Sequence, residues 1–457
     1  MSDSSAPIPL EKTNDGHWNL CGHCDRVVDI SNDELALFAK FIDGEGVSPL
    51  QTRLPSIYLR QIIGKLFHAF TNVQCKFASK NFETTECWDP SAHNEVGLIG
   101  GKATFPSNSC DEIYSGPTIF VANPVYQTPR KNCSSHRDYE MVDLTAVNES
   151  YLPRSITNRK SDSTTYRAHV PVCLGKCISD QFRIICRCRI DPKGERTLIP
   201  SISAKEYLHI NGIISYCFDD LSELINSSGT WSSIPYDWFI RTTQKTHFRK
   251  DIAQYLPALP DNPMIRARSL LLNCVNRDYA DLWREAWDDA YLTDGWLSSD
   301  PRLTKWADHF GGCGRTGPAT QHSHEWRWET PLRTQLDRRQ ALVELDVIVT
   351  KALGLSLDDL LLMYRVSFPV LRKYEADTYY DQNGRCVFSA KSGESYLSRQ
   401  EWESIKDMKE GEFKKTITET VFSDTLTERT ITYTAPFFKK DREADYKEAW
   451  EMLEKRD

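Results

Sequence analysis

Two patterns of hydrophobic and polar residues follow one another along the chain and predict an α+β fold. Residues 31–42 and 55–70 place apolar residues at helical spacing, and the first stretch opens with a Ser-x-x-Glu capping box, Ser31 and Glu34. From about residue 96 to 210 the apolar runs are short and are broken by Gly, Pro, Ser and Asn, which is typical of short strands. We therefore expect short strands mixed with helical segments, and an α+β tail.

The helical pattern returns in the second half of the chain. It predicts helices over 263–291 and 333–353, the latter ended by Gly354, and a third that restarts at Ser356 and breaks at Pro369. Asn383-Gly384 predicts a hairpin turn, and Ser398 with Glu401 predicts another capped helix. Alternating residues over 416–434 predict an antiparallel pair with one wet face.

These changes of pattern divide the chain into five expected parts. They are a flexible tail, a helical region, a region of short strands, a helical domain and a C-terminal α+β tail, over residues 1–20, 21–95, 96–262, 263–355 and 356–457 respectively.

Composition narrows the class of protein. The 457 residues are 40% hydrophobic, which is ordinary for a globular chain, and the net charge of −8 argues against a non-specific polyanion binder. No apolar run reaches the roughly 18 residues that span a bilayer, and the first residues lack the features of a signal peptide. We expect a soluble, cytoplasmic chain without membrane partners, whose 14 cysteines are mostly reduced thiols.

Charge is uneven along the chain. Residues 154–205 hold 11 Lys or Arg against 4 Asp or Glu. This excess predicts a surface that faces phosphates, unless neighbouring segments of the fold balance it.

Two clusters could bind zinc. Cys21 and Cys24 form a Cys-x-x-Cys half-site beside His17 and His23. A structural zinc site needs four ligands, so we expect the second half from elsewhere in the chain, or else plain reduced thiols. Candidates for that half are Cys75, Cys87, Cys173 and Cys177, and the second cluster is His309, Cys313, His322 and His324.

The stretch VANPVYQTPR, residues 121–130, is similar to the Asn-Pro-Pro-Tyr tetrapeptide of DNA amino-methyltransferases, with Val125 in place of the second Pro. In such enzymes the Asn accepts a hydrogen bond from the exocyclic amine and the Tyr stacks on a flipped base. A methyl donor needs a Gly-rich loop between a strand and a helix. Residues 310–314 and 43–49 imitate that loop without such flanks. We expect no complete S-adenosylmethionine-binding Rossmann domain, and the alternative for Asn123 and Tyr126 is a turn whose aromatic residue packs inward.

Longer motifs resemble the C-terminal target-recognition half of type IIG-like, fused restriction-modification adenine methyltransferases and their relatives in phage defence. In residues 230–260 an aromatic-Asp-aromatic pattern is followed by an Arg and a Leu-Pro-x-Leu-Pro exit, here Tyr236, Asp237, Trp238, Arg241, Leu256, Pro257, Leu259 and Pro260. Further similar segments, in the same order, include SGPTIFVANPVYQTPR, LLLNCVNRDYADLWREAW, RRQALVELDVIVTKALGLSLDDL, YRVSFPVLRKYEADTYYDQNGRCVF and ERTITYTAPFFKKDREADYKEAW. The resemblance covers roughly residues 95–457. It implies that residues 96–262 are a DNA-binding target-recognition region and that residues 21–95 are a docking region.

In that family the catalytic domain lies upstream and carries the donor-binding loop. The resemblance therefore implies a non-catalytic sequence-recognition subunit that reads double-stranded DNA and works with a separate N6-adenine methyltransferase or restriction subunit in phage defence. S-adenosylmethionine would belong to that partner and not to this chain. Two alternatives remain open: a docking subunit that does not read DNA, and a divergent methyltransferase that uses Asn123 and Tyr126.

Polar loops with Arg, Lys and Gln suit contacts with phosphates and base edges. The DNA-facing candidates are Arg130, Lys131, Arg154, Arg159, Lys160, Arg241, Gln244, Lys245, His247, Arg249 and Lys250.

Overall fold

The computed structural model describes residues 29–44, 46–55, 65, 69, 82–311, 324–391 and 393–456. Helices and short strands share these residues, so the predicted α+β class is confirmed. The largest sheet is antiparallel throughout and has the order β1-β12-β9-β10. Its strands are β1 (Phe82–Thr85), β12 (Ile213–Phe218), β9 (Arg183–Arg187) and β10 (Pro200–Ser203).

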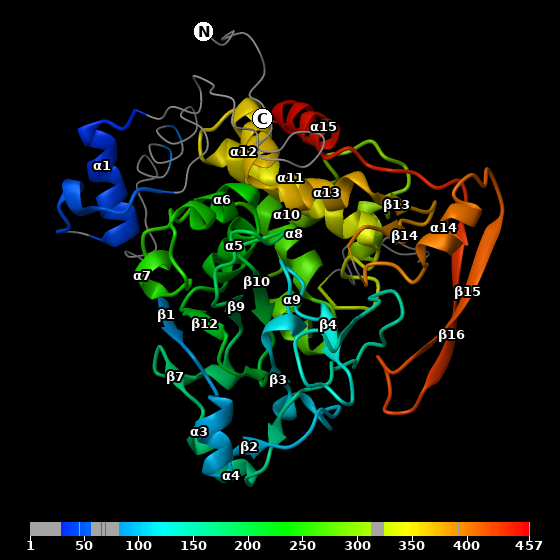
Figure 1. Ribbon diagram of the computed structural model, residues 1–457, viewed down its shortest axis with the longest axis horizontal. Coiled ribbons are helices and arrows are strands. Elements are labelled where there is room, and N and C mark those ends of the chain that lie inside the picture. Colours follow the sequence, from blue (N-terminus) through cyan, green and yellow to red (C-terminus); the bar gives the residue numbers. More distant parts are fainter. Residues whose placement is uncertain are drawn as a thin grey trace.

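A layer of helices covers this sheet and lies above it in Figure 1. Helix α5 contacts strands of the sheet and packs on α8, which in turn packs on α11, and α11 contacts α12 and α15. The layer consists of α5 (Leu221–Trp231), α6 (Ile234–Thr242), α8 (Pro263–Asn273), α11 (Gln335–Ala352), α12 (Leu357–Ser367), α13 (Pro369–Ala376) and α15 (Arg442–Glu454).

Helices α5 and α8 approach closely because α5 carries Gly229 at the crossing. A Cβ at this position would come within 2.6 Å of the Ile265 Cγ2 atom, so a larger residue would push the two helices apart.

Short elements extend the molecule below and beside this centre. A long hairpin of β15 and β16 forms one edge of the molecule (Figure 1). Helices α3 and α4, which are far apart in the sequence, lie together at the lower end. The other strands are β2 (Ile99–Gly100), β3 (Ile113–Tyr114), β4 (Gln127–Pro129), β5 (Tyr139–Met141), β6 (Asn158–Arg159), β7 (Val172–Cys173), β8 (Lys176–Cys177), β11 (Leu208–His209), β13 (Thr378–Tyr380), β14 (Cys386–Ser389), β15 (Glu412–Glu419) and β16 (Thr427–Thr434). The other helices are α1 (Asn32–Phe38), α3 (Pro90–Glu95), α4 (Ser163–Ala168), α7 (Lys250–Ala253), α9 (Ala280–Glu285), α10 (Ala290–Thr293) and α14 (Arg399–Ile405), the π-helix η2 (Ala39–Asp43), and the 3₁₀ turns η3 (Pro49–Gln51), η5 (Ser109–Asp111), η6 (Gly116–Thr118), η7 (Ile178–Asp180), η8 (Arg277–Tyr279) and η9 (Trp306–Phe310).

Local signals in the sequence set several element ends. Ser31, Ser356 and Ser398 each cap a helix in a capping box, as predicted for the first and last of these. The predicted break at Pro369 is confirmed, because α13 begins there, and the predicted Asn383-Gly384 turn joins β13 to β14. The helical stretch predicted over 263–291 is divided into α8, η8, α9 and α10.

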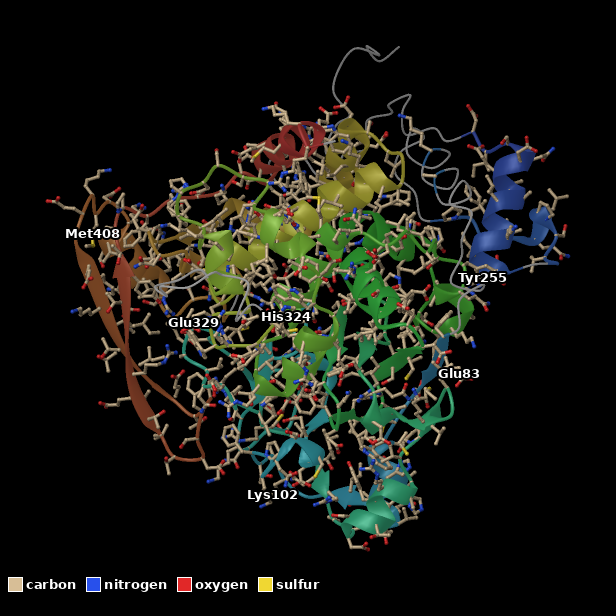
Figure 2. All side chains as sticks on the ribbon, turned by 180° about the vertical axis from the view of Figure 1, so that it is seen from behind. Glu83, Lys102, Tyr255, His324, Glu329 and Met408 are labelled. Carbon is tan, nitrogen blue, oxygen red and sulfur yellow. The ribbon has the colours of Figure 1, made fainter. Side chains whose placement is uncertain are left out.

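One hydrophobic core crosses the expected domain boundaries. It includes Trp231 from the expected target-recognition region, Leu345 from the expected helical domain and Leu453 from the C-terminal tail. Two smaller cores fill the lower end around Trp88 and the outer edge around Trp402. Figure 2 shows the side chains packed between these layers from behind.

Helix α11 passes through this core although many of its residues are charged or polar. Glu344 and Asp346 are fully buried, and each has more than one partner. Glu344 accepts from Arg268 Nε at 2.7 Å and from the Leu297 amide at 2.8 Å. Asp346 accepts from Arg442 Nη2 at 2.9 Å and from the Ile234 amide at 2.7 Å. The helix is therefore fixed to its neighbours by charge as well as by apolar packing.

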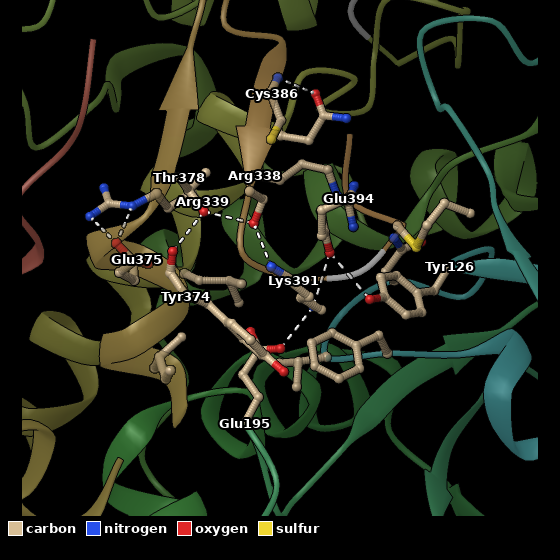
Figure 3. A pocket seen from close by; sticks show the side chains of 18 of the residues that line it. Tyr126, Glu195, Arg338, Arg339, Tyr374, Glu375, Thr378, Cys386, Lys391 and Glu394 are labelled. Carbon is tan, nitrogen blue, oxygen red and sulfur yellow. Dashed lines mark hydrogen bonds and ion pairs between the residues drawn. The ribbon is translucent and has the colours of Figure 1, made fainter. Parts of the chain in front are cut away.

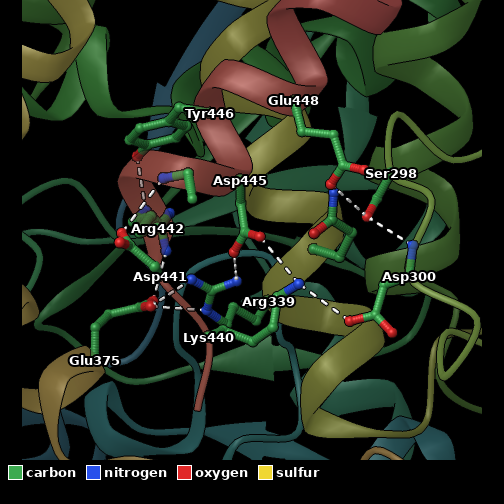
Figure 4. A network of polar contacts seen from close by, with 12 residues as sticks. Ser298, Asp300, Arg339, Glu375, Lys440, Asp441, Arg442, Asp445, Tyr446 and Glu448 are labelled. Carbon is green, nitrogen blue, oxygen red and sulfur yellow. Dashed lines mark hydrogen bonds and ion pairs between the residues drawn. The ribbon is translucent and has the colours of Figure 1, made fainter.

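The C-terminal helix α15 is held to α11 by the network in Figure 4. Arg339 lies between Glu375 and Asp445, with Nη-to-oxygen distances of 2.6 Å to each carboxylate. Lys440 then links Asp445 at 3.0 Å to Asp300 at 3.1 Å. Burial raises the cost of each charge, so the network depends on every carboxylate keeping its cation.

Among the described residues, no helix is both long enough and apolar enough to cross a bilayer. The described cysteines are all free thiols. That agrees with the prediction of reduced cysteines for this part of the chain.

The buried Arg268–Glu344 pair gives a first test of this architecture. We expect Arg268→Met to lower the free energy of unfolding by about 3–5 kcal/mol, because it leaves a buried carboxylate without its cation. The double variant Arg268→Met, Glu344→Leu should recover part of that loss, since both charges are then gone. Urea unfolding measures both, and a loss below about 1 kcal/mol for the single variant would contradict the role assigned to the pair.

Candidate functional site

The candidate DNA-facing residues fall in three separate places and in the interior. Arg130 and Lys131 follow β4, and Arg159 and Lys160 lie at β6, which pairs with β2 at the lower end of the molecule. Figure 1 places β4, β2 and α7 well apart. The remaining exposed candidates lie in the segment between α6 and α7 or at the start of α7. The structure thus does not bring all the candidates onto one surface.

Two of the candidates are buried, so the prediction that they contact DNA is wrong. Arg154 is 1% exposed, and its guanidinium donates to the Pro129 carbonyl at 2.8 Å and to Asp424 at 3.2 Å. Arg241 is 8% exposed, and it donates to the Ser367 carbonyl at 2.7 Å and to the Pro192 carbonyl at 3.1 Å. These N–H groups connect segments of the fold instead of facing solvent.

The same outcome holds for much of the basic stretch 154–205. Arg183 is fully buried and donates to carbonyls, and Arg196 forms a buried ion pair with Asp237 at 2.6 Å. Arg187 donates to the carbonyls of Gly116 and Ile119. The excess of basic residues therefore serves the interior as much as the surface, and no continuous basic strip follows from it.

Three exposed candidates and the partly buried Lys245 do lie together. We call the side chains of Arg189, Lys245, His247, Arg249 and Lys250 the α6–α7 surface; four of these five are exposed and Lys245 is partly buried. Arg189 was not among the predicted residues. It lies two residues beyond the end of β9, and its signal in the sequence is the alternation Arg187-Cys188-Arg189 at the end of a strand.

The backbone of the α6–α7 surface is anchored to the sheet. The Phe248 amide donates to the Cys188 carbonyl at 2.7 Å, and the Ile190 amide donates to the Thr246 carbonyl at 3.0 Å. Phe248 is 1% exposed and packs edge-on against Trp231 at a centroid distance of 5.5 Å. Arg189 and His247 are antiparallel bridge partners, so their side chains leave the same face.

The Arg249–Glu86 pair of this surface is exposed, and the Lys245–Asp251 pair joins a partly buried lysine to an exposed carboxylate. Arg249 contacts Glu86 at 2.6 Å and Lys245 contacts Asp251 at 3.5 Å, while Lys250 lies over the Phe82 ring at 5.5 Å. Exposed pairs contribute little to stability, so a phosphate can replace either carboxylate at small cost.

Four other candidates are engaged by neighbouring side chains or backbone. Arg159 pairs with Asp111 at 3.0 Å, and Lys160 donates to Asn94 at 2.9 Å. Arg130 pairs with Glu140 at 3.4 Å, and Lys131 beside it is exposed. Gln244, the proposed base-edge contact, has a positive φ of 54° and donates to the Leu54 carbonyl at 2.9 Å.

The Asn-Pro-Val-Tyr segment forms a turn. Phe120 and Asn123 exchange backbone hydrogen bonds of 2.9 and 3.0 Å, and Ala122 between them has a φ of 49°. The Asn123 Oδ1 atom accepts from the Val125 amide at 3.1 Å. Tyr126 is 8% exposed and stacks on Phe120 at 4.8 Å. Both side chains that a methyl transfer would use are thus engaged in local structure, as the turn alternative predicts.

A cavity of about 180 Å³ lies beside this turn, and Figure 3 shows its lining. Lys391 contributes its ammonium group, which lies 2.8 Å from Glu195 and 2.9 Å from Glu394. The Tyr126 hydroxyl donates to Glu394 at 3.2 Å. The ammonium also lies 4.4 Å from the centre of the Phe120 ring. The group combines residues near 120–126, Glu195 and the segment 391–394, which are far apart in the sequence. No spacing along the chain could therefore have predicted it.

Lys391 and Tyr126 keep their ordinary protonation states in this cluster. Burial would lower the pKa of Lys391, but the charge of Glu394, with Tyr126 and Glu195, raises that pKa well above its usual value. Burial raises the pKa of Tyr126. At neutral pH the lysine is therefore charged and the phenol neutral, so neither is set up as a general base.

Only some of the candidate metal ligands are among the residues that the structure describes. Cys21, Cys24, His17, His23, Cys75, Cys313 and His322 lie outside the described residues. His309 is 3% exposed and its Nδ1 lies 3.1 Å from the Glu329 carbonyl, while the His324 ring lies against Trp287. Within the described part of the chain, no three His, Cys, Asp or Glu side chains are arranged to hold a metal ion. Zinc binding stays a prediction.

The segments that imitate a donor-binding loop are only partly described. Phe310 ends the 3₁₀ turn η9, and Gly311 follows in the left-handed region, so a helical turn precedes this segment where a donor loop needs a strand. Asp43 ends the π-helix η2, which precedes the other imitation.

The Lys391 cluster can be tested by removing its cation. We expect Lys391→Met to lower the free energy of unfolding by about 1–3 kcal/mol at pH 7, because Glu195 and Glu394 then share a partly buried site without a counter-charge. The loss should shrink as the pH falls from 7 towards 5, since uncompensated carboxylates have a raised pKa in the folded state and favour protonation.

In the wild-type chain the pKa of Lys391 is raised in the folded state, so this group stabilises the fold fully at any pH below its unfolded pKa of about 10.4. The contribution of Lys391 to the free energy of unfolding should therefore be constant from pH 6 to 9. Lys406→Met is the matched control, because Lys406 and its partner Glu403 are both exposed. Thermal unfolding across this pH range would contradict the assignment if the two variants behaved alike.

Comparison with known proteins adds no family. The chain matches no protein-family model, and no curated protein matches it significantly.

Proposed function

We propose that this chain binds double-stranded DNA through the α6–α7 surface, as the recognition subunit of an adenine methyltransferase whose donor-binding chain is separate. The observation that carries the proposal is the grouping of Arg189, His247, Arg249 and Lys250 on segments anchored beyond the end of β9, an inner strand of the central sheet. The family resemblance over residues 230–260 points to the same segment.

The physical properties of this surface suit a nucleic-acid backbone. Its cations are exposed, and a rigid sheet and the buried Phe248 position them, as is usual for binding segments. Phosphate contacts of this kind set register and affinity, and base contacts then set sequence preference. Arg189 and His247 leave one face as neighbours and are the proposed contacts with base edges.

The interior arrangement supports a subunit without its own methyl-transfer site. Asn123 and Tyr126 are held by the turn and by Glu394, and neither side chain is presented to a flipped base. In this proposal S-adenosylmethionine is bound by the partner chain. The docking subunit that does not read DNA remains the competing proposal, and DNA binding separates the two.

The first test is a charge series on DNA binding. We expect the triple variant Arg189→Gln, Arg249→Gln, Lys250→Gln to weaken binding to a mixed-sequence duplex and to reduce the slope of log K against log salt by about 2, because the phosphate contacts of Arg249 and Lys250 are lost together with the base-edge contact of Arg189. Fluorescence anisotropy at several salt concentrations measures both quantities.

The control is a triple variant with the same change in net charge. Lys373, Lys447 and Lys455 are exposed on α13 and α15 or at its end, away from α7 in Figure 1, and their replacement by Gln should leave the slope nearly unchanged. Equal effects of the two triples would mean that only net charge matters. No effect of the first triple would favour the docking subunit.

The second test addresses the partner. We expect the full chain, recovered from its native host, to co-purify with a chain that carries a donor-binding Gly-rich loop and an Asn-Pro-Pro-Tyr motif, as mass spectrometry would show. The isolated chain should not bind S-adenosylmethionine in a calorimetric titration. Binding by the isolated chain would reopen the divergent-methyltransferase alternative.

A further inference from the structure

The cavity beside the Asn-Pro-Val-Tyr turn has a second group of charged residues. Arg333 and Arg338 line it together with Gln335. The other arginines in its lining each have a carboxylate: Arg196 pairs with Asp237, Arg339 with Glu375 and Asp445, and Arg442 with Asp346 and Glu375. For Arg333 and Arg338 no carboxylate oxygen lies within 4.0 Å among the residues that the structure describes.

Both guanidinium groups are held in place by backbone carbonyls. Arg338 donates through Nη1 to Leu272 at 2.9 Å and to Leu332 at 3.1 Å, and through Nη2 to Ala122 at 2.8 Å. Arg333 donates through Nη1 to the Val275 carbonyl at 2.9 Å and through Nε and Nη2 to the Trp328 carbonyl.

These hydrogen bonds do not use all the N–H donors of Arg333 and Arg338. A guanidinium has five N–H groups. The hydrogen bonds to described residues account for three on each arginine, so two N–H groups of each remain, including the Nε–H of Arg338. The carbonyls therefore fix the geometry of the two cations without compensating their charge.

The electrostatic cost of this arrangement is visible in both groups. Burial, followed by the charge of Arg333, lowers the pKa of Arg338 to about 9. Burial also lowers the pKa of Arg333, to about 10, although the carboxylates of Glu329 and Glu149 act in the opposite direction. On the same cavity, Glu195 and Glu394 are already bound to Lys391. A bound anion would supply the missing counter-charge.

We propose that this end of the cavity binds a small oxyanion, the carboxylate or phosphate group of a small molecule, between Arg333 and Arg338. Arginine presents paired N–H donors that match both anions. The cavity volume of about 180 Å³ is below the roughly 300–1,000 Å³ of sites for drug-sized ligands, so the occupant is small. The site shares no residue with the α6–α7 surface, so this proposal can be tested independently of DNA binding.

The test uses the full chain with inorganic phosphate and acetate as probes, at ionic strength held constant with sodium chloride. We expect at least one probe to raise the Tm with saturation, as binding to the folded state requires, and to titrate in calorimetry. A response to phosphate alone identifies a phosphate group as the ligand chemistry, and a response to acetate identifies a carboxylate. Absence of a saturable response to both would overturn the proposal.

Two variants locate the site. Arg338→Gln should weaken the responding probe about 10-fold or more, because a charged hydrogen-bond donor is lost. That variant also loses structural bonds, so Gln335→Glu is the sharper one. Gln335 lies one turn from Arg338 on α11, and its Oε1 already accepts from the Cys386 amide at 3.2 Å, which a carboxylate can still do.

Gln335→Glu places an anion of the chain's own in the cavity. We expect this variant to have a higher Tm than the wild-type chain without probe, and to lose the response to phosphate or acetate. A helix-dipole effect alone would raise the Tm but would leave the probe response intact. An unchanged response in Gln335→Glu would place the anion elsewhere and overturn the proposal.

Discussion

The buried charges of helix α11 are the constraint on which the rest of the structure depends. Arg339 and Asp346 lie two turns apart on one side of this helix and both reach α15, and Asp346 also reaches the start of α6. Glu344 lies on another side of the helix and reaches α8. A buried ion pair adds little net stability, but an unpaired buried charge costs several kcal/mol. Arrangements that leave any of these groups without its partner are therefore strongly disfavoured, which fixes how the surrounding helices sit on the sheet.

Arginine plays a related part across the molecule by joining distant segments through their carbonyl groups. Arg154 reaches the turn after β15, and Arg241 reaches both the end of α12 and the turn after β9. Irregular segments bury carbonyls that have no partner within a helix or strand, and a guanidinium can satisfy several at once. This explains why a basic stretch in the sequence does not become a basic surface.

The two places with functional chemistry are set apart by the fold. The α6–α7 surface lies on segments anchored beyond the end of β9. The cavity lies among α11, the Asn-Pro-Val-Tyr turn and the segment after β14. Surface binding and ligand binding can thus occur in the same chain without competing for residues.

By itself the sequence determined the local structure of this protein. Capping boxes at Ser31 and Ser398, the break at Pro369 and the Asn383-Gly384 turn each act through neighbouring atoms, so a few residues suffice to predict them. The apolar periodicity likewise located α11 to within two residues at its start and one at its end.

Only the tertiary structure decided which charged residues face solvent and which groups meet. Arg154 and Lys160 look alike in the sequence, yet one is buried and the other exposed. Lys391 meets Glu195, and Arg333 and Arg338 lack a carboxylate among the described residues, because of contacts between segments far apart in the chain. The physical reason is that burial and charge compensation depend on neighbours in space, and the spacing of residues along one segment carries no information about them.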